Sequence, residues 1–282
     1  MTAPKTEKAK RQIIVLYDFS SSSDNALRHG LKMCFVLKAG LTLVYPLLKG
    51  EDASERGVRK VQMKALVSRL QLEYGIEVQA FAPDKKLKFF FRPLYEQIEG
   101  IMLVAGITGK NFVCGLSMVA FLKLVRKSRV PWLTVPEFTP VGDYNHVVLP
   151  ISYSRQTKEK IAWASYFHRL NQSAIHVLAP KGKDGFIKIG IYKNTEFLKK
   201  MYTTLEIYFK LIQTEKTIND IDEYALSYAS EHLYAPVIIT VTPSQDIFDL
   251  LFGATERKII MNQQGIPVLC INPLDDMYVV CS

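Results

Sequence analysis

Short apolar runs alternate with longer amphipathic segments along most of the chain. The runs are rich in Val, Ile and Leu and lack the polar alternation of a half-exposed strand, which is typical of parallel strands buried on both faces. The pattern predicts strands over 13–17, 41–45, 77–81, 101–105, 132–135, 147–149, 175–178, 209–213, 237–240 and 268–271.

The segments between these runs have apolar residues at helical spacing. In the first half they predict helices over 23–37, 53–74, 94–99 and 117–127. Ser20 to Ser23 stand at the start of the first helix and are predicted to cap it, because a side-chain oxygen there accepts a hydrogen bond from the free amides of the first turn. Strands that alternate with helices in this way predict a parallel sheet covered by helices on both faces.

The chain also repeats itself. Residues 13–46 align without a gap on residues 147–180, and the same offset places the run that begins at Ile101 on the run that begins at Ala235. One offset that fits two separated blocks indicates a duplication. With the turn-rich segment EFTPVGDYN as linker, we predict a basic tail over 1–12 and two similar doubly wound α/β domains over 13–141 and 142–282, each with a five-stranded parallel sheet.

Length and composition fit two such domains. The chain has 282 residues, of which 48% are hydrophobic, enough for buried cores in both. No apolar stretch is long enough to span a membrane, and the first dozen residues are polar. We therefore expect neither a spanning helix nor a signal peptide, and a cytoplasmic location without a membrane partner.

A formal net charge of +9 permits contact with nucleic acid, anionic lipid or a phosphate ligand. The segment FAPDKKLKFFFRP mixes bases with aromatics and could stack single-stranded nucleic acid, or it is a strand end followed by a loop. No recognised nucleic-acid-binding signature accompanies it, which favours the second interpretation. No nucleic-acid partner is therefore expected.

The sequence supplies no catalytic or metal-binding motif. The four cysteines lie far apart without a C-x-x-C pair, and the five histidines show no metal-ligand spacing. Neither G-x-S-x-G nor a Walker-type phosphate loop occurs, and no His partner stands out for the serines before the first helix. We therefore predict that the protein is not an enzyme and holds no metal.

Several segments together resemble the universal stress protein family in its tandem two-domain form. The first half has IIVLYDFSSSSDNAL, LTLVYP, LVAGITG and VPWLTVP, and the second half closes with FGATERKIIMNQQGIPVLCINP. The resemblance implies ligands at the carboxyl ends of the strands, where the strand order of a doubly wound sheet reverses. It also implies that the last strands of the two halves, 132–135 and 268–271, pair to form an internal pseudo-dimer.

The resemblance further implies a nucleotide site. In family members that bind ATP, an Asp after the first strand holds the adenine region, and a pattern of Gly, two residues, Gly, nine residues, then Gly and Ser or Thr wraps the ribose and phosphates. Glycines suit this role because they let the backbone approach a phosphate closely. Asp18, Gly106 and Gly109 match the first positions, whereas Val119 stands at the third glycine. Ser117, nearby, is the candidate for a phosphate-side contact.

Each of these residues also has a purely structural interpretation, which stays open. Asp18 can start a helix as a cap or turn residue, and Gly106 and Gly109 can simply permit a tight turn between strand and helix. The functional interpretation also stays open, because Gly115 and Ser117 can form a shortened turn in place of the missing third glycine of the phosphate pattern.

The second half departs from the pattern at other positions. Ser152 stands where the acid is expected, Thr240 and Pro243 replace the first two glycines, and Gly253 keeps its place. Proline also lacks the amide that could meet a phosphate. Nucleotide binding is therefore predicted only for the first half.

The predicted function is that of a non-catalytic stress-response or signalling module, with weak binding of ATP or another adenine nucleotide in the first domain. Two alternatives stay open. One is a ligand-free protein-interaction module whose pockets are degenerate, and the other is a nucleotide-processing enzyme such as a slow ATP hydrolase. A homodimer and a protein partner that the sequence does not identify also stay open.

Overall fold

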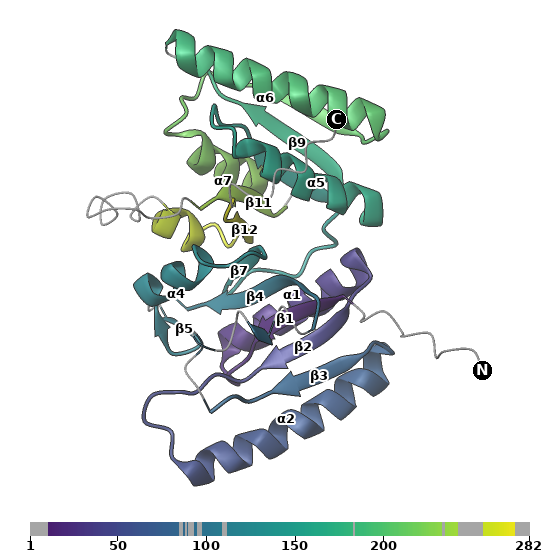
Figure 1. Cartoon of the computed structure of the whole chain (residues 1–282), viewed down its shortest axis with the longest axis vertical. Helices are drawn as coiled ribbons and strands as arrows, with labels where there is room; N and C mark the ends of the chain where they lie inside the picture. The colour runs from purple at the N-terminus through teal and green to yellow at the C-terminus, as the bar shows by residue number, and fades with distance from the viewer. Residues whose placement is uncertain are drawn as a thin grey trace, which may run out of the picture.

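The computed structural model describes residues 11–84, 87, 89, 93–94, 98–108, 112–182, 184–232, 235–241 and 256–273. Within these residues, a 10-stranded sheet has the order β10-β9-β8-β11-β12-β7-β4-β1-β2-β3. The sheet runs along the long axis of the molecule, with helices on both of its faces (Figure 1). The predicted α/β class is confirmed.

The first half contributes five parallel strands. Its elements are β1 (Gln12–Leu16), α1 (Ser21–Leu37), β2 (Gly40–Val44), α2 (Ala53–Tyr74), β3 (Val78–Phe81), β4 (Gly100–Ile107), α4 (Met118–Val125) and β7 (Trp132–Pro136). The chain moves outward from β1 to β3 and then returns to the other side of β1, where β4 pairs. This reversal places a switch point at the carboxyl ends of β1 and β4.

The second half repeats this topology. Its elements are β8 (His146–Pro150), α5 (Thr157–Asn171), β9 (Ala174–Ala179), α6 (Gly185–Thr204), β10 (Phe209–Gln213), α7 (Ile221–His232), β11 (Val237–Thr240) and β12 (Val268–Ile271). The strand order β10-β9-β8-β11-β12 matches that of the first half, so the second switch point lies between β8 and β11. Each half is thus a five-stranded, doubly wound parallel sheet, as predicted.

The predicted strands nearly coincide with the observed ones, but the region after β4 differs. β4 extends to Ile107, and two further strands, β5 (Phe112–Val113) and β6 (Leu116–Ser117), form a small antiparallel hairpin. The apolar pattern did not predict this hairpin because strands of this length are too short to show a period. The predicted helix over 94–99 lies partly outside the described residues, and residues 98–99 form a turn.

The two halves pair through their last strands. β7 and β12 run antiparallel, with Leu133 opposite Leu269. The Thr134 hydroxyl donates a further hydrogen bond to the Val268 carbonyl at 3.0 Å. This is the pairing that the resemblance implies, and it leaves β3 and β10 as the outer strands of the sheet. An apolar strand that would otherwise be an exposed edge is thereby covered in each half.

Two helical layers cover the sheet. α1, α2, α5 and α6 lie on one face, and α4, α7 and the helical residues 256–260 lie on the other (Figure 1). Each layer buries a core that runs through both halves: Val15 and Val147 share one core, and Leu16 and Val148 share the other. Successive side chains of a strand point to opposite faces, so each central strand contributes to both cores.

The linker between the halves is held by α1. Asn25 donates from its side-chain amide to the carbonyls of Pro136 and Thr139, at 3.2 and 3.0 Å. His29 is fully buried, with Nδ1 2.5 Å from the Tyr144 hydroxyl and Nε2 3.4 Å from the Thr139 carbonyl. A neutral imidazole with its proton on Nε2 meets both partners, because the carbonyl can only accept and the hydroxyl can donate.

A buried ion pair joins the two halves on the opposite face. Arg126 follows α4, and its Nη2 lies 2.6 Å from Oε2 of Glu256. The two side chains are 12% and 13% exposed. Asn272, which follows β12, donates from its side-chain amide to the Arg126 carbonyl. A pair at this depth stabilises the joint only while both partners are present, because either charge alone would be desolvated without compensation.

We expect His29 to make the protein less stable in mild acid. Burial lowers the pKa of His29 to about 4, and the hydrogen bond to Thr139 offsets this only in part. In the unfolded chain the pKa returns to about 6.5. Protonation therefore favours the unfolded chain. The free energy of unfolding is unaffected above about pH 6.5 and falls between there and about pH 4, by at most about 1.4 kcal/mol per pH unit.

Urea unfolding at about pH 7.5 and about pH 5 measures this effect. His29→Gln does not titrate, so it should lose less stability than the wild type over the same interval, although it starts from a lower value. Equal losses in the two proteins would show that His29 is not the group responsible.

Candidate functional site

Asp18 and Gly106 lie together at the first switch point. Asp18 follows the end of β1, and Gly106 lies at the carboxyl end of β4, which pairs with β1. In doubly wound sheets, ligands bind in the crevice at this position. The structure therefore places two of the predicted site residues at the expected edge of the sheet.

Asp18 is engaged in local hydrogen bonds. Its Oδ1 accepts from the Ser20 amide at 3.1 Å and from the Ser20 hydroxyl at 2.5 Å. Ser20 is in turn the N-cap of α1 and accepts from the Ser23 amide at 3.2 Å. Ser20 is thus a cap, as predicted, and Asp18 orients it as an Asx-turn residue.

The segment after β4 folds back toward Asp18 as a hairpin. β5 and β6 are joined by Cys114 and Gly115, whose φ values are 45° and 72°. Two central residues with positive φ are typical of the type I′ turn. Cys114 is 5% exposed. Burial, and then the negative charge of Asp18, raise the pKa of its thiol well above its usual value.

Ser117 ends this hairpin and is the N-cap of α4. Its Oγ accepts from the Ala120 amide at 3.3 Å, and the residue is exposed. The first turn of α4 contains no acidic residue. Gly115 serves the hairpin turn, and a Cβ there would lie 3.3 Å from a methyl group of Leu48. The turn that includes Gly115 and Ser117 is therefore a hairpin packed on the β2 side of the crevice.

Gly106 is required by the packing of α1 on β4. A Cβ at this position would lie 2.1 Å from the Ser22 carbonyl oxygen and 2.5 Å from its carbon. Both contacts are to backbone, so no side-chain rotation could relieve them. Gly106 pairs with Val135 inside the sheet. The apolar pattern predicted that the strand ends before Gly106, whereas the observed strand continues to Ile107.

Aromatic side chains that the sequence analysis did not single out occupy the space beside Asp18. Tyr17 and Phe19 follow β1 and Tyr45 follows β2; the ring of Phe19 meets those of Tyr17 and Tyr45 edge to face, with centroids 4.9 and 5.8 Å apart. Arg59 of α2 places its guanidinium 4.9 Å from the centroid of the Phe19 ring. These residues meet only because β1 and β2 pair in parallel and in register, a relation that no local motif encodes.

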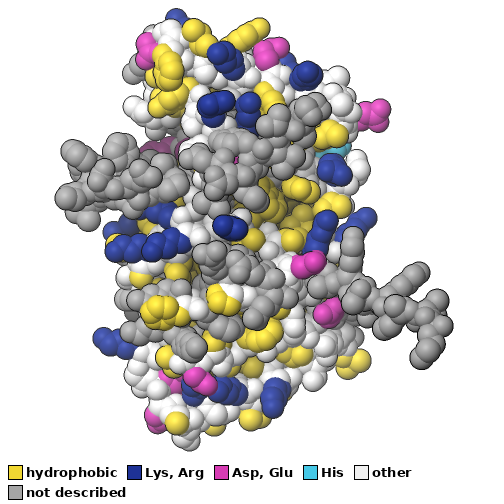
Figure 2. Space-filling view, in the orientation of Figure 1, with side chains coloured by type: hydrophobic (Ala, Val, Ile, Leu, Met, Phe, Trp, Pro, Cys, Tyr) yellow, Lys and Arg dark blue, Asp and Glu magenta, His cyan; other side chains and the backbone are white. Residues whose placement is uncertain are grey.

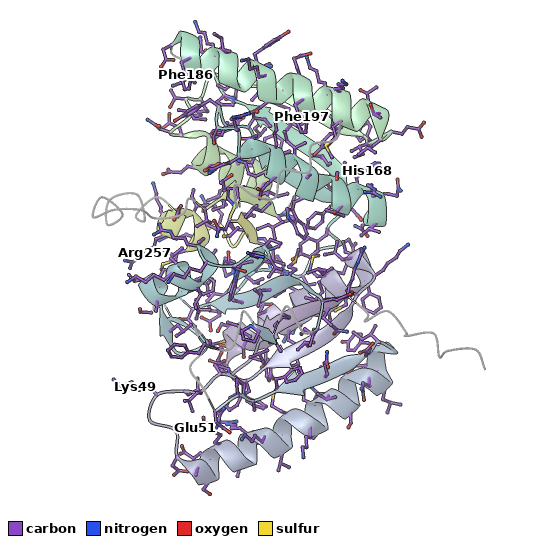
Figure 3. The ribbon with its side chains drawn as sticks, viewed as in Figure 1. Lys49, Glu51, His168, Phe186, Phe197 and Arg257 are labelled. Atoms are coloured by element: carbon purple, nitrogen blue, oxygen red, sulfur yellow. The ribbon has the colours of Figure 1, made fainter. Side chains whose placement is uncertain are left out.

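A buried arginine fixes the connection from β2 to α2. Glu51 lies on that connection (Figure 3), and its carboxylate is 3.0 Å from Nη1 of Arg56 and accepts from the Tyr45 hydroxyl. Nε of Arg56 also lies 3.0 Å from Asp84, after β3, and the Arg56 hydrogen bond lowers the pKa of that carboxyl. Arg56 thus holds the segments that follow β2 and β3 together through Glu51 and Asp84.

The second switch point has different chemistry. Lys160 of α5 is 2% exposed, and its Nζ donates to the Pro150 carbonyl, at the end of β8, at 2.7 Å. Burial lowers the pKa of Lys160, an effect that the charge of Asp222 on α7 partly offsets. Ser152, which stands where the acid was expected, accepts from the Ser154 amide at 3.2 Å. A lysine ammonium therefore lies at the end of the strand that corresponds to β1.

Thr240 takes the place of Gly106 at the end of β11. The helix at this switch point also differs, because α5 begins at Thr157, two residues later in the repeat than α1 does. Its N-cap, Gln156, makes no side-chain capping bond. In the first half the glycine thus accompanies an earlier helix start with a side-chain cap, and the second half has Thr240 and a later start without one.

Gly109, Pro243 and Gly253 lie outside the described residues. The place of Gly109 in a phosphate loop of the first half, and the loss of that loop at Pro243 in the second half, stay predictions. Among the residues that the structure describes, no group of three or more His, Cys, Asp or Glu side chains is placed to hold a metal ion.

Solved structures share this fold. A universal stress protein from Archaeoglobus fulgidus DSM 4304 superposes with a TM-score of 0.71 at 10% identity, over 92% of this chain and 97% of its own. A protein assigned as a universal stress protein from Pseudomonas aeruginosa UCBPP-PA14 has a TM-score of 0.60 at 16% identity, over 93% of each chain. A functionally unknown protein from Pseudomonas aeruginosa PAO1 has a TM-score of 0.60 at 16% identity, over 94% of this chain and 93% of its own.

No protein-family model matches the chain, and no curated protein matches its sequence. Two of these three neighbours are named as universal stress proteins, and at these identities the likeness establishes the fold alone.

We expect Gly106→Ala to destabilise the protein by about 2 kcal/mol or more, since the added methyl group would overlap backbone atoms of Ser22. Gly57→Ala is the matched control, because Gly57 lies within α2 and a Cβ there meets nothing within 4 Å. Alanine is the better helix former, so the control should gain up to about 1 kcal/mol. Urea unfolding of both variants tests this. A loss below about 0.5 kcal/mol in Gly106→Ala would mean that α1 does not depend on this glycine.

Proposed function

We propose that the protein is a non-catalytic stress-response or signalling module that acts through contact with another protein. The fold that it shares with universal stress proteins supports the stress-response role. The hydrogen bonds between Asp18 and Ser20 at the first switch point support a version of this role in which no nucleotide binds, called here the ligand-free form.

The proposal that no nucleotide binds rests on one observation, which is the hydrogen bonding of the Asp18 carboxylate. This group, which would hold the adenine region in a nucleotide-binding relative, accepts hydrogen bonds from the amide and from the hydroxyl of Ser20. A ligand would have to replace these bonds to reach the carboxylate. A hydrogen bond exchanged for another of similar strength contributes little net free energy.

The second switch point supports the same proposal. Lys160 is buried and bonded to the end of β8, and Thr240 carries a side chain where a close backbone approach would need glycine. An adenine nucleotide would therefore meet an ammonium group in place of the acid.

A nucleotide-processing enzyme is the weaker alternative. Such an enzyme needs a general base or a bound metal beside the crevice. Three of the predicted or neighbouring polar residues instead serve the start of a helix: Ser20 and Ser117 are N-caps, and Asp18 orients Ser20.

Weak binding of ATP or another adenine nucleotide in the first half is the second candidate. It is favoured by Ser117, which caps α4 at an exposed position where the first turn carries no acid, so a phosphate could meet free backbone amides. Asp18 and Gly106 lie at the switch point on the same side of the sheet, and Gly109 would complete the set. Binding would be weak because a ligand would have to replace the hydrogen bonds from Ser20 to Asp18.

The proposal includes a cytoplasmic location, domain boundaries at 13–141 and 142–282, an internal pseudo-dimer of the two domains, and either a homodimer or a separate protein as partner. None of the helices in the described part of the chain is long and apolar enough to cross a membrane. Lys and Arg side chains are spread over several parts of the visible face (Figure 2). Nucleic acid, which would favour a continuous basic stripe, is not part of the proposal.

Purified protein should release no adenine nucleotide when it is denatured, and calorimetric titration with ATP and magnesium should give no heat of binding. Asp18→Ala should lower the free energy of unfolding by about 1 kcal/mol, through loss of the turn that orients the α1 cap, and leave the titration unchanged. Asp24→Ala is the matched control, since it removes a nearby acid within α1, whose carboxylate accepts from the Tyr17 hydroxyl at 2.6 Å.

Nucleotide that is present in the wild type and Asp24→Ala, but lost in Asp18→Ala, would establish the second candidate and overturn the ligand-free form. Formation of ADP or AMP on incubation with ATP and magnesium would establish the enzyme.

A further inference from the structure

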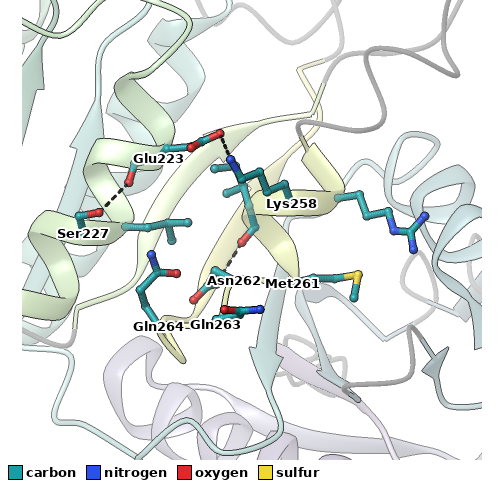
Figure 4. A pocket seen from close by; sticks show the side chains of 10 residues that line it. Glu223, Ser227, Lys258, Met261, Asn262, Gln263 and Gln264 are labelled. Atoms are coloured by element: carbon teal, nitrogen blue, oxygen red, sulfur yellow. Dashed lines mark hydrogen bonds and ion pairs between the residues drawn. The ribbon is translucent and has the colours of Figure 1, made fainter.

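A cavity of about 520 Å³ lies between α7 and the helical residues 256–260, and polar groups around it bond one another (Figure 4). Lys258 Nζ lies 2.7 Å from Glu223 Oε1, and the Ser227 hydroxyl donates to the Glu223 carbonyl at 3.4 Å. These groups are engaged within the chain itself.

α2 offers a surface of a different kind. It lies at one end of the long axis of the molecule (Figure 1). Its inner face packs on the core through Met63, Leu66 and Leu70, which are at most 7% exposed. Its outer face carries three large apolar side chains that solvent reaches, and these are Val58, 55% exposed, Val61, 67% exposed, and Leu72, 90% exposed. The helix is therefore apolar on two sides, of which only the inner one is buried.

The outer residues follow the spacing of a coiled-coil seam. Six exposed residues lie alternately four and three positions apart, which is the a/d repeat of a heptad, and these are Ser54, Val58, Val61, Ala65, Ser68 and Leu72, called here the α2 seam. The Ser68 hydroxyl donates to the Lys64 carbonyl of its own helix at 3.3 Å. This hydroxyl therefore keeps a partner if the seam is buried, and its burial costs little.

The α2 seam is complementary to itself when two copies of α2 run antiparallel. In such a pair each a position packs against a d position of the other helix, and one register brings together all six residues. Its layers are Leu72 with Ser54 of the second copy, Val58 with Ser68, and Val61 with Ala65. Each layer joins a larger side chain to a smaller one, which lets the two helices interdigitate without a void.

Charges beside the seam favour the antiparallel arrangement. In this register Arg69 of each copy lies beside Glu55 of the other, which gives two pairs of opposite charge, and the two Lys64 side chains give one like-charge contact. Glu55 Oε2 accepts from the Asp52 amide at 3.2 Å, and a carboxylate can accept further bonds. In a parallel pair Arg69 would instead lie beside Lys64 of the other copy, which gives two like-charge contacts.

From this self-complementary seam we infer that α2 binds α2 of a second copy of this chain, antiparallel and about a two-fold axis. The inference rests on the homodimer that the proposed function includes as one of its two kinds of partner, and it does not depend on whether a nucleotide binds. The two-fold axis closes the contact, so association should stop at the dimer. One helix pair is smaller than a standard interface, so the dimer should be weak and reversible.

Sedimentation velocity between about 1 and about 500 μM should show a monomer–dimer equilibrium with a Kd of about 1–100 μM. Val61→Glu and Leu72→Glu should each weaken the dimer by about tenfold or more, because a carboxylate would be buried in the seam. Ile189→Glu is the matched control, since Ile189 is 55% exposed on α6 and the change in charge is the same. The control should dimerise as the wild type does, and thermal unfolding establishes that each variant is folded.

Arg69→Glu distinguishes the two arrangements of the helices. It should weaken an antiparallel dimer by about tenfold, because two acids then meet at each end of the seam, and Glu55→Lys in the same chain should restore the affinity. In a parallel dimer Arg69→Glu would strengthen association, since the new acid would face Lys64.

A wild-type chain that stays monomeric at about 500 μM would overturn the inference and leave a separate protein as the partner in the proposed function. A dimer that Val61→Glu and Leu72→Glu do not weaken, or that Ile189→Glu weakens equally, would place the contact elsewhere and overturn it too. So would stronger association of Arg69→Glu, or growth of the wild type beyond the dimer.

Discussion

The antiparallel pairing of β7 with β12 is the contact on which the rest of the molecule depends. Each half ends in an apolar strand, Trp132–Pro136 or Val268–Ile271, that would expose its backbone groups and its side chains if the half stood alone. Their pairing turns two sheets into one and makes both cores continuous across the joint. The buried contacts of His29 with the linker and of Arg126 with Glu256 are possible only because the strands hold these partners together.

The two switch points show how one topology is adapted by a few residues. In the first half, Gly106 admits the start of α1, and the resulting turn uses Asp18 to orient the cap. In the second half, Thr240 stands at the corresponding place, α5 starts later without a side-chain cap, and Lys160 satisfies the end of β8. The residues that look like remnants of a ligand site are thus also the residues that fit each helix to its strand. A pattern match to Asp and Gly alone does not separate these two roles.

Most of the fold could be predicted because its signals are local and repeated. Buried parallel strands are apolar throughout, helices have their own period, and an offset that fits two blocks implies the same topology twice. The candidate site was harder. Its position at the strand ends followed from the topology, but the hairpin at 112–117 and the packing of Tyr17, Phe19 and Tyr45 did not. Each of these joins residues from different strands.

By itself the sequence determined the order of strands and helices in both halves, because hydrophobic period is a property of the chain read in one direction. The pairing of the two last strands was implied only by the resemblance. The tertiary structure decided what the polar residues do. Asp18 accepts two hydrogen bonds from Ser20, and Gly106 leaves room for the Ser22 backbone. The role of a polar group depends on which donors, acceptors and charges surround it, and distant segments supply these only when the sheet forms.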